Sequence, residues 1–283
     1  MKGYTGKILR VNLTDRKITT IDTKKYVEYV GGHGMASAIF WDLCEDKTID
    51  GFDPRNIVMF MNSPISGSIT PSGAGRCEVA GIGVQSYPIG WYTRSNFGGR
   101  FSTMMKYAGW DGIVIEGKAD KPVWLDIRNN QVNIQDAKGV WGLSTWDAQE
   151  EIWEFVNDSL TKDGWKGLSS KRDAGLTTQK PAVVSIGQAG ENLSRTACLV
   201  HDAGNGAGQG GFGAVLGSKN LKAISIIGTG SHEPDNPNAL IEARINAKEN
   251  YAMNLDNLTD GWTGGRLGTN SSPTMFYDPI SNG

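Results

Sequence analysis

Residues 202–222 read Asp-Ala-Gly-Asn-Gly-Ala-Gly-Gln-Gly-Gly-Phe-Gly-Ala-Val-Leu-Gly-Ser-Lys-Asn-Leu-Lys and hold seven glycines, six of them between positions 204 and 213. Because glycine loses more backbone freedom on ordering than any other residue, this density predicts a loop rather than a helix or a strand. Such a backbone lets main-chain N–H groups approach an anion such as a phosphate. An exposed surface loop is the alternative. The apolar run Leu221–Ile227 follows as a predicted strand, which favours a loop held between ordered elements.

The glycine spacing also fits a dinucleotide-binding motif, Gly206-x-Gly208-x-x-Gly211, although a loop this rich in glycine produces such matches by chance. A dinucleotide site needs a long helix after the glycines and then a strand that ends in an acidic residue. Only residues 214–220 separate the last loop glycine from the next strand, and the nearest acidic residue downstream is Glu233. The context therefore disfavours this motif, and the absence of Gly-Lys-Ser/Thr excludes a Walker loop.

The composition is that of a globular protein and gives no sign of a nucleic-acid or membrane surface. Of the 283 residues, 39% are apolar and 20% are charged, and the formal net charge is −2. The basic residues are scattered, and no apolar run approaches the length of a membrane span. Cys44, Cys77 and Cys198 form no Cys-x-x-Cys pair that would indicate zinc or an iron–sulfur cluster. Their odd number and wide spacing favour a reducing compartment, so we expect a cytoplasmic protein.

Short strands dominate the chain up to residue 230 and predict one β-rich unit. Asn129-Asn130 is a suitable turn for one hairpin. Residues 234–237 are typical of a linker and residues 239–251 of an amphipathic helix, so we expect a domain over residues 1–230. Residues 231–283 should then hold the linker and the start of a second, helical domain. Apolar runs predict strands at 7–13, 17–21, 56–61, 77–84, 91–93, 111–116, 122–127, 131–135, 181–186 and 221–227.

Helices are predicted at residues 24–29, 35–43 and 100–107, and after a capping box made by Ser144 and Asp147. Residues 163–179 are polar and are expected to form an exposed insertion. The helix behind the capping box should bury one apolar face, made by Ala148, Ile152, Phe155 and Val156.

Ser95-Asn-Phe-Gly-Gly99 is a second glycine site, and it directly precedes the helix predicted at residues 100–107. Amides at the start of that helix could face an anion. The turn-rich loop 63–75 delivers Arg76. Among the histidines, His33 and His232 are expected to have structural or surface roles, whereas His201 borders the glycine loop and could also contact a cofactor.

Six stretches, in this order, resemble the N-terminal part of the aldehyde:ferredoxin oxidoreductase family of tungsten enzymes. The order extends over most of the chain, which makes the signal specific. The stretches are Gly6–Thr14, Gly73–Arg76, Asn96–Gly99, Lys106–Asp111 with Ile115–Lys118, Ile186–Asn192 and Gly210–Ile224.

The resemblance implies an α+β fold in which two sheets form a base for a bis-pterin cofactor that carries tungsten or molybdenum through pterin sulfurs. It implies that Arg76 binds a pterin phosphate and that Asn96 and Gly98 make a second cofactor contact. It further implies that the main-chain carbonyls of Asn96 and Gly206 bind the magnesium ion that bridges the two pterin phosphates. Guanidinium groups suit phosphates, and oxygen ligands suit magnesium.

The chain departs from the family pattern within the glycine loop. The family commonly has Arg-x-x-Gly-Arg-Gly-Gly, whereas residues 205–211 are Asn-Gly-Ala-Gly-Gln-Gly-Gly. Asn205 and Gln209 therefore replace two arginines and offer neutral hydrogen bonds, so the main chain at Gly206 and Gly208 is expected to carry more of the anion binding. The segment after Tyr87 is also longer than in well-known members, which indicates a divergent subfamily.

The function implied by the resemblance is oxidation of an aldehyde to a carboxylate. Electrons would leave through a [4Fe–4S] cluster to ferredoxin or to iron–sulfur partner subunits. The cluster cysteines and the acid–base residues are expected outside residues 1–283, so we assign no catalytic residue here and expect the remainder of a longer chain. An oligomer is expected. The alternatives are a low-potential reductase of the benzoyl-CoA reductase type and a non-catalytic scaffold subunit that only holds the pterin.

Overall fold

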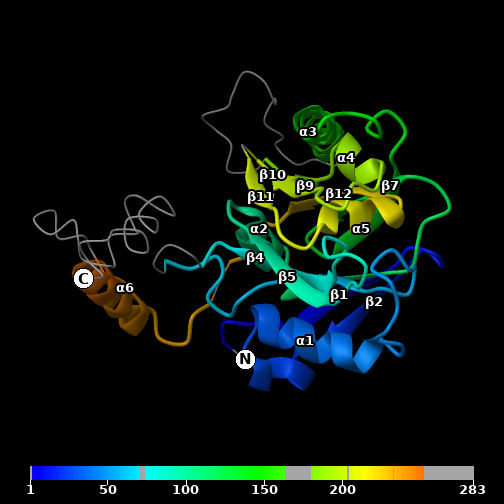
Figure 1. Cartoon of the computed structure of the whole chain (residues 1–283). Helices are drawn as coiled ribbons and strands as arrows, with labels where there is room; N and C mark the ends of the chain where they lie inside the picture. Colours follow the sequence, from blue (N-terminus) through cyan, green and yellow to red (C-terminus); the bar gives the residue numbers. More distant parts are fainter. Residues whose placement is uncertain (1, 70–73, 163–179, 203, 232, 252–283) are drawn as a thin grey trace, which may run out of the picture. The chain divides into compact units, whose positions relative to one another are not determined.

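The computed structural model describes residues 2–69, 74–162, 180–202, 204–231 and 233–251 (Figure 1). The described chain falls into two units. The first contains both sheets and ends at Asp235, and the second contains Ile69 and helix α6 (Pro237–Tyr251). Among the described residues, no helix combines the length and the apolar character needed to cross a membrane. The insertion expected at 163–179, His232 and the segment after 251 lie outside the described residues.

The first sheet has six strands in the order β2-β1-β6-β3-β4-β5. β1 pairs in parallel with β6, and its other neighbours are antiparallel, beginning with the β1–β2 hairpin. Most strands follow the predicted runs because alternation of apolar residues is a local signal. The bounds are β1 Lys7–Asn12, β2 Lys17–Asp22, β3 Val58–Met61, β4 Cys77–Ile82, β5 Tyr92–Phe97 and β6 Gly112–Glu116.

The second sheet also has six strands, in the order β11-β10-β9-β12-β7-β8. The β7–β8 hairpin turns at Asn129-Asn130, as predicted, and β12 pairs in parallel with β7. The bounds are β7 Val123–Arg128, β8 Gln131–Asp136, β9 Ala182–Ser185, β10 Leu199–His201, β11 Asn205–Ala207 and β12 Leu221–Ile227.

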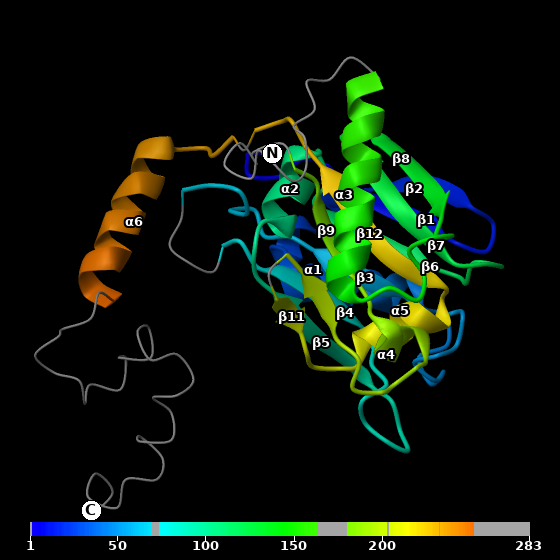
Figure 2. The same ribbon diagram turned by 90° about the horizontal axis from the view of Figure 1, so that it is seen from above.

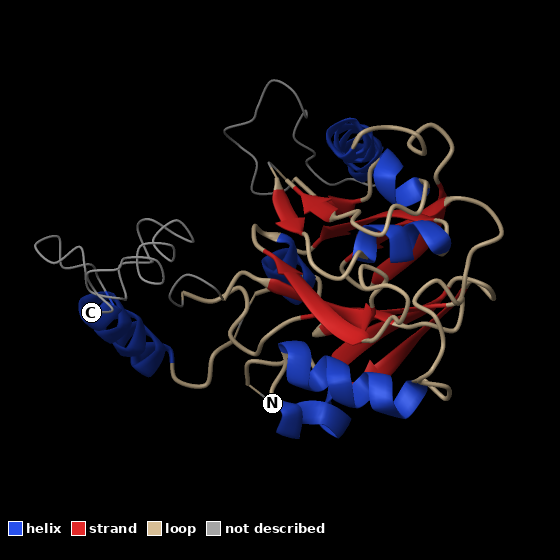
Figure 3. Ribbon diagram, in the orientation of Figure 1, coloured by secondary structure: helices blue, strands red, loops and turns tan. Residues whose placement is uncertain are grey.

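Helices fill the space between the sheets and cover their outer faces (Figure 3). Helices α2 (Phe101–Tyr107) and α5 (Phe212–Ser218) contribute to the main core between the sheets. The 3₁₀ helix η1 (Thr23–Tyr29) and α1 (Gly32–Leu43) cover the first sheet. Helix α3 (Thr145–Lys162) covers the second sheet, and Figure 1 shows α1 and α3 on opposite sides of the two sheets. This arrangement confirms the predicted α+β fold with two sheets. A short helix, α4 (Gln188–Glu191), packs against α5.

The glycine-rich stretch is not one continuous loop, which corrects the first expectation from its composition. Residues 205–207 form β11 and residues 212–218 form α5. A Cβ atom on Gly213 would lie 2.6 Å from the carbonyl oxygen of Cys198, and one on Gly217 would overlap the carbonyl oxygen of Gly190. Glycine is therefore required here by close packing. Burial of Phe212 and Leu216 offsets the low helix propensity of the two glycines.

The capping box that starts α3 is confirmed, because the Asp147 amide donates to Ser144 Oγ at 3.2 Å and the Ser144 hydroxyl donates to Asp147 Oδ2 at 2.7 Å. Ile152 and Val156 are buried as predicted. Phe155 was wrongly assigned to the apolar face, since its side chain is 47% exposed. Its ring packs edge-on against Trp124, with ring centroids 5.4 Å apart, at the rim of the helix–sheet contact.

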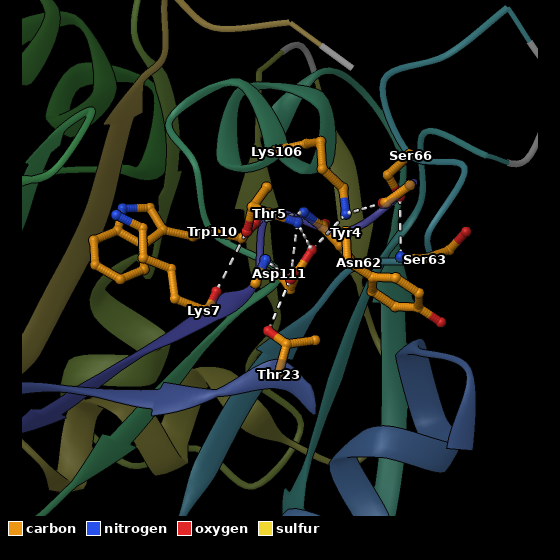
Figure 4. Close-up of polar contacts among 12 residues, drawn as sticks. Tyr4, Thr5, Lys7, Thr23, Asn62, Ser63, Ser66, Lys106, Trp110 and Asp111 are labelled. Carbon is orange, nitrogen blue, oxygen red and sulfur yellow. Dashed lines mark hydrogen bonds and ion pairs between the residues drawn. The ribbon is translucent and has the colours of Figure 1, made fainter. Parts of the chain in front are cut away.

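A buried ion pair ties the N-terminal segment to the first sheet (Figure 4). Asp111 accepts hydrogen bonds from Lys106 Nζ at 2.7 Å, the Thr23 hydroxyl at 2.8 Å, and the amides of Thr5 and Gly6, each at 3.0 Å. The side chains of Lys106 and Asp111 are 2% and 3% exposed. Burial lowers the pKa of Lys106, and the Asp111 charge opposes that shift. One carboxylate therefore joins three separate segments to the start of β6.

We expect Asp111→Asn to lower the free energy of unfolding by about 3 kcal/mol, because it leaves a buried ammonium group without its negative partner. Urea unfolding of the purified protein measures this loss. The control is Asp136→Asn, which breaks the exposed pair with Lys121 and should have a much smaller effect. Equal losses in the two variants would contradict a special role for the Asp111 cluster.

Candidate functional site

The open edges of the two sheets meet at one place. β5 is the outer strand of the first sheet, β11 is the outer strand of the second, and the two strands lie side by side (Figure 2). This contact brings β5, which contains Asn96, against β11, which contains Asn205 and Gly206. Residues that sequence reasoning assigned to one cofactor site from two distant stretches therefore share one edge of the molecule.

Two glycines after β5 make the contact possible. A Cβ atom on Gly98 would lie 3.1 Å from Asn205 Oδ1, so the amide side chain of Asn205 covers this glycine. Gly99 has a φ of +82°, and a Cβ atom there would lie 2.6 Å from Cδ2 of His201. Only a residue without a side chain fits at Gly99, because its backbone is in the left-handed region and an aromatic ring occupies the adjacent space.

Arg76 lies at the entrance of β4 with an exposed side chain, and its Nη1 donates to Asn96 Oδ1 at 2.6 Å. Asn96 stands opposite Glu78 in the β4–β5 register. The structure thus links Arg76 to Asn96 directly, and Asn96 to Gly98 and Asn205 through the chain that follows β5. An accessible guanidinium beside an amide is a suitable arrangement for a phosphate.

The main chain of the glycine loop is open at the two glycines predicted to approach the cofactor. Gly206 and Gly208 are both exposed. Apart from the adjacent residues, the described part of the chain offers a Cβ atom on Gly206 one neighbour within 4 Å, the Leu199 carbonyl oxygen at 3.9 Å, and one on Gly208 the Cys198 Sγ at 3.8 Å. The described residues therefore leave the space in front of both glycines open within that range.

Gln209 has a different environment from the two glycines. Its amide donates to Ser95 Oγ at 3.2 Å, which fixes the loop to β5, while the residue as a whole is exposed. The next amide, of Gly210, donates to Gln85 Oε1 at 2.7 Å. The amides of residues 209 and 210 therefore hold the loop in place, and the open main chain lies at Gly206 and Gly208.

His201 is a core residue, so the expectation that it could contact a cofactor is not supported by its surroundings. Its side chain is completely buried. Nδ1 lies 2.7 Å from the Val183 carbonyl oxygen and so carries the proton, and Nε2 accepts the Arg100 amide at 3.2 Å. That amide was expected to face an anion. In the second glycine site, residues 95–97 belong to β5, and α2 starts at Phe101.

A polar row that sequence reasoning missed lies next to Asn96. The Glu78 carboxyl stands between His33 Nδ1, at 3.3 Å, and Arg94 Nη1, at 3.8 Å. Burial raises the pKa of Glu78, and the Arg94 charge opposes that shift. Burial, followed by the Arg94 charge, lowers the pKa of His33. In the sequence, this row is indicated locally only by Glu78, an acidic residue in an otherwise apolar strand.

The residues present fit an anionic cofactor held mainly by the backbone. Arg76 supplies one accessible positive charge, Asn96 and Asn205 supply amides, and the open main chain of Gly206 can be approached by a ligand. Hard cations such as magnesium prefer oxygen ligands of this kind. Within the part of the chain that the structure describes, no three His, Cys, Asp or Glu side chains are grouped so that they could hold a metal ion.

The chain matches a known protein family over most of its length. Residues 8–228 match the aldehyde ferredoxin oxidoreductase, N-terminal domain. The chain belongs to the aldehyde ferredoxin oxidoreductase family. It is 39% identical over 231 residues to a tungsten-containing aldehyde ferredoxin oxidoreductase of Pyrococcus abyssi, which covers 81% of this chain and 34% of that relative.

Two further proteins that resemble this chain have other names. This chain is 32% identical over 235 residues to an aliphatic sulfonate oxidoreductase, WOR-like subunit, of Pyrococcus furiosus, and the match covers 81% of this chain and 35% of the relative. Among solved structures, the active site complex BamBC of benzoyl coenzyme A reductase with 1,5-dienoyl-CoA superposes with a TM-score of 0.76 and 28% identity. The match covers 89% of this chain and 36% of that one. The chain thus spans about a third of the length of these relatives.

We expect Gly99→Ala to lower the free energy of unfolding by about 2 kcal/mol more than Gly139→Ala, because only Gly99 faces a packed ring. Both glycines have positive φ, +82° and +92°, so their backbone strain is matched, and a Cβ atom on Gly139 would meet no described residue beyond its chain neighbours within 4 Å. Urea unfolding of both variants gives the difference. Equal losses in the two variants would show that the His201 ring can move away from a methyl group at position 99 without lowering the free energy of unfolding.

Proposed function

We propose that this chain provides the phosphate- and magnesium-binding base of a tungsten (or molybdenum) bis-pterin oxidoreductase. The observation that carries the proposal is the contact between β5 and β11, which places Arg76, Asn96 and the open glycine backbone on one edge. Family membership supports the same assignment. In this proposal residues 1–230 form the cofactor-binding domain, and residues 231–283 form a linker and the start of a helical domain.

The named residues have separate tasks. Arg76 binds a pterin phosphate through its guanidinium, and the main-chain carbonyls of Asn96 and Gly206 bind the magnesium ion between the phosphates. Gly98 makes a second cofactor contact beside Asn96, and Gly208 leaves room for the cofactor, while Asn205 and Gln209 offer neutral hydrogen bonds. When bound, the metal–pterin group supplies a two-electron redox centre. The protein's part here is to hold, orient and partly neutralise that group.

The reaction we propose is oxidation of an aldehyde to a carboxylate in the complete cytoplasmic enzyme, which we expect to be an oligomer. Electrons leave through a [4Fe–4S] cluster, whose ligands lie outside residues 1–283, to ferredoxin or iron–sulfur partner subunits. The names of the Pyrococcus aldehyde oxidoreductases support this reaction. A low-potential reductase of the benzoyl-CoA reductase type is the second candidate, favoured by the structural likeness to BamBC. An aldehyde-dependent dye-reduction assay on the full-length protein separates the two candidates.

We expect Arg76→Ala to reduce the tungsten and pterin content of the full-length protein. A hydrogen bond to a charged group contributes about 1.5–3 kcal/mol, which corresponds to a loss of roughly tenfold or more in affinity. Elemental analysis of the purified protein measures tungsten per chain. The control is Arg55→Ala, another exposed arginine, which pairs with Asp53 on a different loop. Full metal occupancy in Arg76→Ala would count against the phosphate assignment.

We also expect Gly208→Val to displace the cofactor, whereas Gln209→Ala should retain most of it. Gly208 has no positive φ, and a Cβ atom there has space within the protein, so valine is compatible with the folded chain. A clash with a closely packed ligand costs about 1–3 kcal/mol, and loss of a neutral hydrogen bond only about 1 kcal/mol. Cofactor retention in the two full-length variants is the measurement. The reverse order of losses would mean that side chains hold the cofactor.

A further inference from the structure

The side chain of Arg100 joins the two backbone segments that form the candidate site. Arg100 directly follows Gly98 and Gly99, and it donates from Nε to Asp202 Oδ2 at 3.0 Å and from Nη2 to Asp202 Oδ1 at 3.2 Å. Asp202 lies at the end of β10, just before Asn205. A bidentate pair of this kind fixes orientation as well as distance.

The same guanidinium also contacts the second sheet through the backbone before β9. Nη2 donates to the Pro181 carbonyl oxygen at 2.7 Å, and Nη1 donates to that of Lys180. The side chains of Arg100 and Asp202 are 29% and 22% exposed. Burial raises the pKa of Asp202, but the Arg100 guanidinium, which donates two hydrogen bonds to this carboxylate, opposes that shift, and the pKa lies below its usual range. Arg100 thus connects the end of β5 to two neighbouring strands of the other sheet.

The His201 ring completes the connection from inside. It lies between Phe97 and Phe101, with both ring-centroid distances at 5.8 Å. Its main-chain oxygen accepts the Asn205 side-chain amide at 3.4 Å, and its Nε2 accepts the Arg100 amide. Gly99 packs directly against the ring. Movement of either segment would therefore have to break several of these contacts together.

The backbone of Asp202 shows that the ion pair constrains the chain. Asp202 has a φ of +46°, in the left-handed region that residues other than glycine seldom adopt. Such a conformation is unfavourable in free energy and persists only where surrounding contacts hold it. The carboxylate bonds to Arg100 supply those contacts, and they orient the turn that leads into β11.

We propose that Arg100 and Asp202 are positioning residues that set the separation between segments 96–99 and 205–208, and so the spacing of the Asn96 and Gly206 carbonyl oxygens. The consequence for the metal rests on the proposed function. Magnesium demands near-ideal octahedral geometry with short bonds. Main-chain oxygens on two different sheets have no side-chain torsion with which to adjust, so the spacing between the sheets decides whether both can bind the ion.

The test uses Asp202→Asn and the milder Arg100→Lys in the full-length protein, with Asp126→Asn as the matched control. Asp126 forms a buried ion pair with Arg128 within β7, so its loss also removes a buried charge pair but away from this edge. Amide hydrogen exchange should become about tenfold faster at residues 98–99 and 205–206 in Asp202→Asn, less so in Arg100→Lys, and remain at the wild-type rate there in the control.

The second readout is the rate at which bound magnesium is lost to EDTA, measured by elemental analysis together with tungsten per chain. Asp202→Asn should lose magnesium about tenfold faster than wild type, and Asp126→Asn should match wild type. Unchanged exchange in both site variants would overturn the proposal, and so would faster exchange with wild-type magnesium release. A wild-type protein that holds neither tungsten nor magnesium would overturn the proposed function instead, and the exchange data would still decide whether the pair holds the two segments.

Discussion

The contact between the outer strands β5 and β11 is the constraint on which the candidate site depends. Edge strands present unpaired main-chain groups, and proteins usually protect or cover them. Here each sheet brings its edge to the other, and Gly98 and Gly99 permit the approach because Asn205 and His201 occupy the space that side chains would need. The result is an edge that is closed on the inside by packing and open on the outside at Gly206 and Gly208. Under the proposed function, a ligand at this edge would contact backbone from both sheets at once.

Local sequence patterns predicted most strands and the β7–β8 hairpin correctly, because alternation and turn residues act over a few positions. The capping box at Ser144 was found for the same reason. The grouping of Arg76, Asn96 and Asn205 came from family resemblance alone. Nothing in the spacing of these residues indicates that they lie on neighbouring edges, since the contact between β5 and β11 depends on how two complete sheets stack.

The structural features that sequence analysis missed depend on residues that are distant in the chain. Gly213 and Gly217 looked like loop residues, but they are small because α5 packs closely on residues 190 and 197–198. Their role is fixed by neighbours that no local window contains. The pairing of Arg100 with Asp202 is likewise invisible in the sequence, where the two are far apart. The prediction that Phe155 is buried was wrong for a related reason. Helical spacing indicates which way a side chain points, but it does not indicate how far the neighbouring sheet extends to cover it.

The lysines that follow the glycine loop show how the positive charge of this region is distributed. Lys219 and Lys222 are close in sequence to the predicted phosphate site, yet both ammonium groups point into the protein. Lys219 donates to the carbonyl oxygens of Pro54 and Gly117, at 3.1 and 3.0 Å, and burial lowers its pKa to about 8. Lys222 donates to the Leu143 carbonyl oxygen at 2.9 Å and pairs with Glu191.

These two lysines therefore hold the end of α5 and the start of β12 in place and contribute little charge to a ligand outside. Asn205 and Gln209 are neutral, and Arg100 is paired with Asp202. Of the residues assigned to the candidate site, Arg76 is the one with an accessible positive charge. A doubly phosphorylated ligand would bring more negative charge than one guanidinium can balance. Under the proposed function, a bound divalent cation and the oriented main-chain amides would supply further positive potential, so the spacing of the two backbone segments would affect binding.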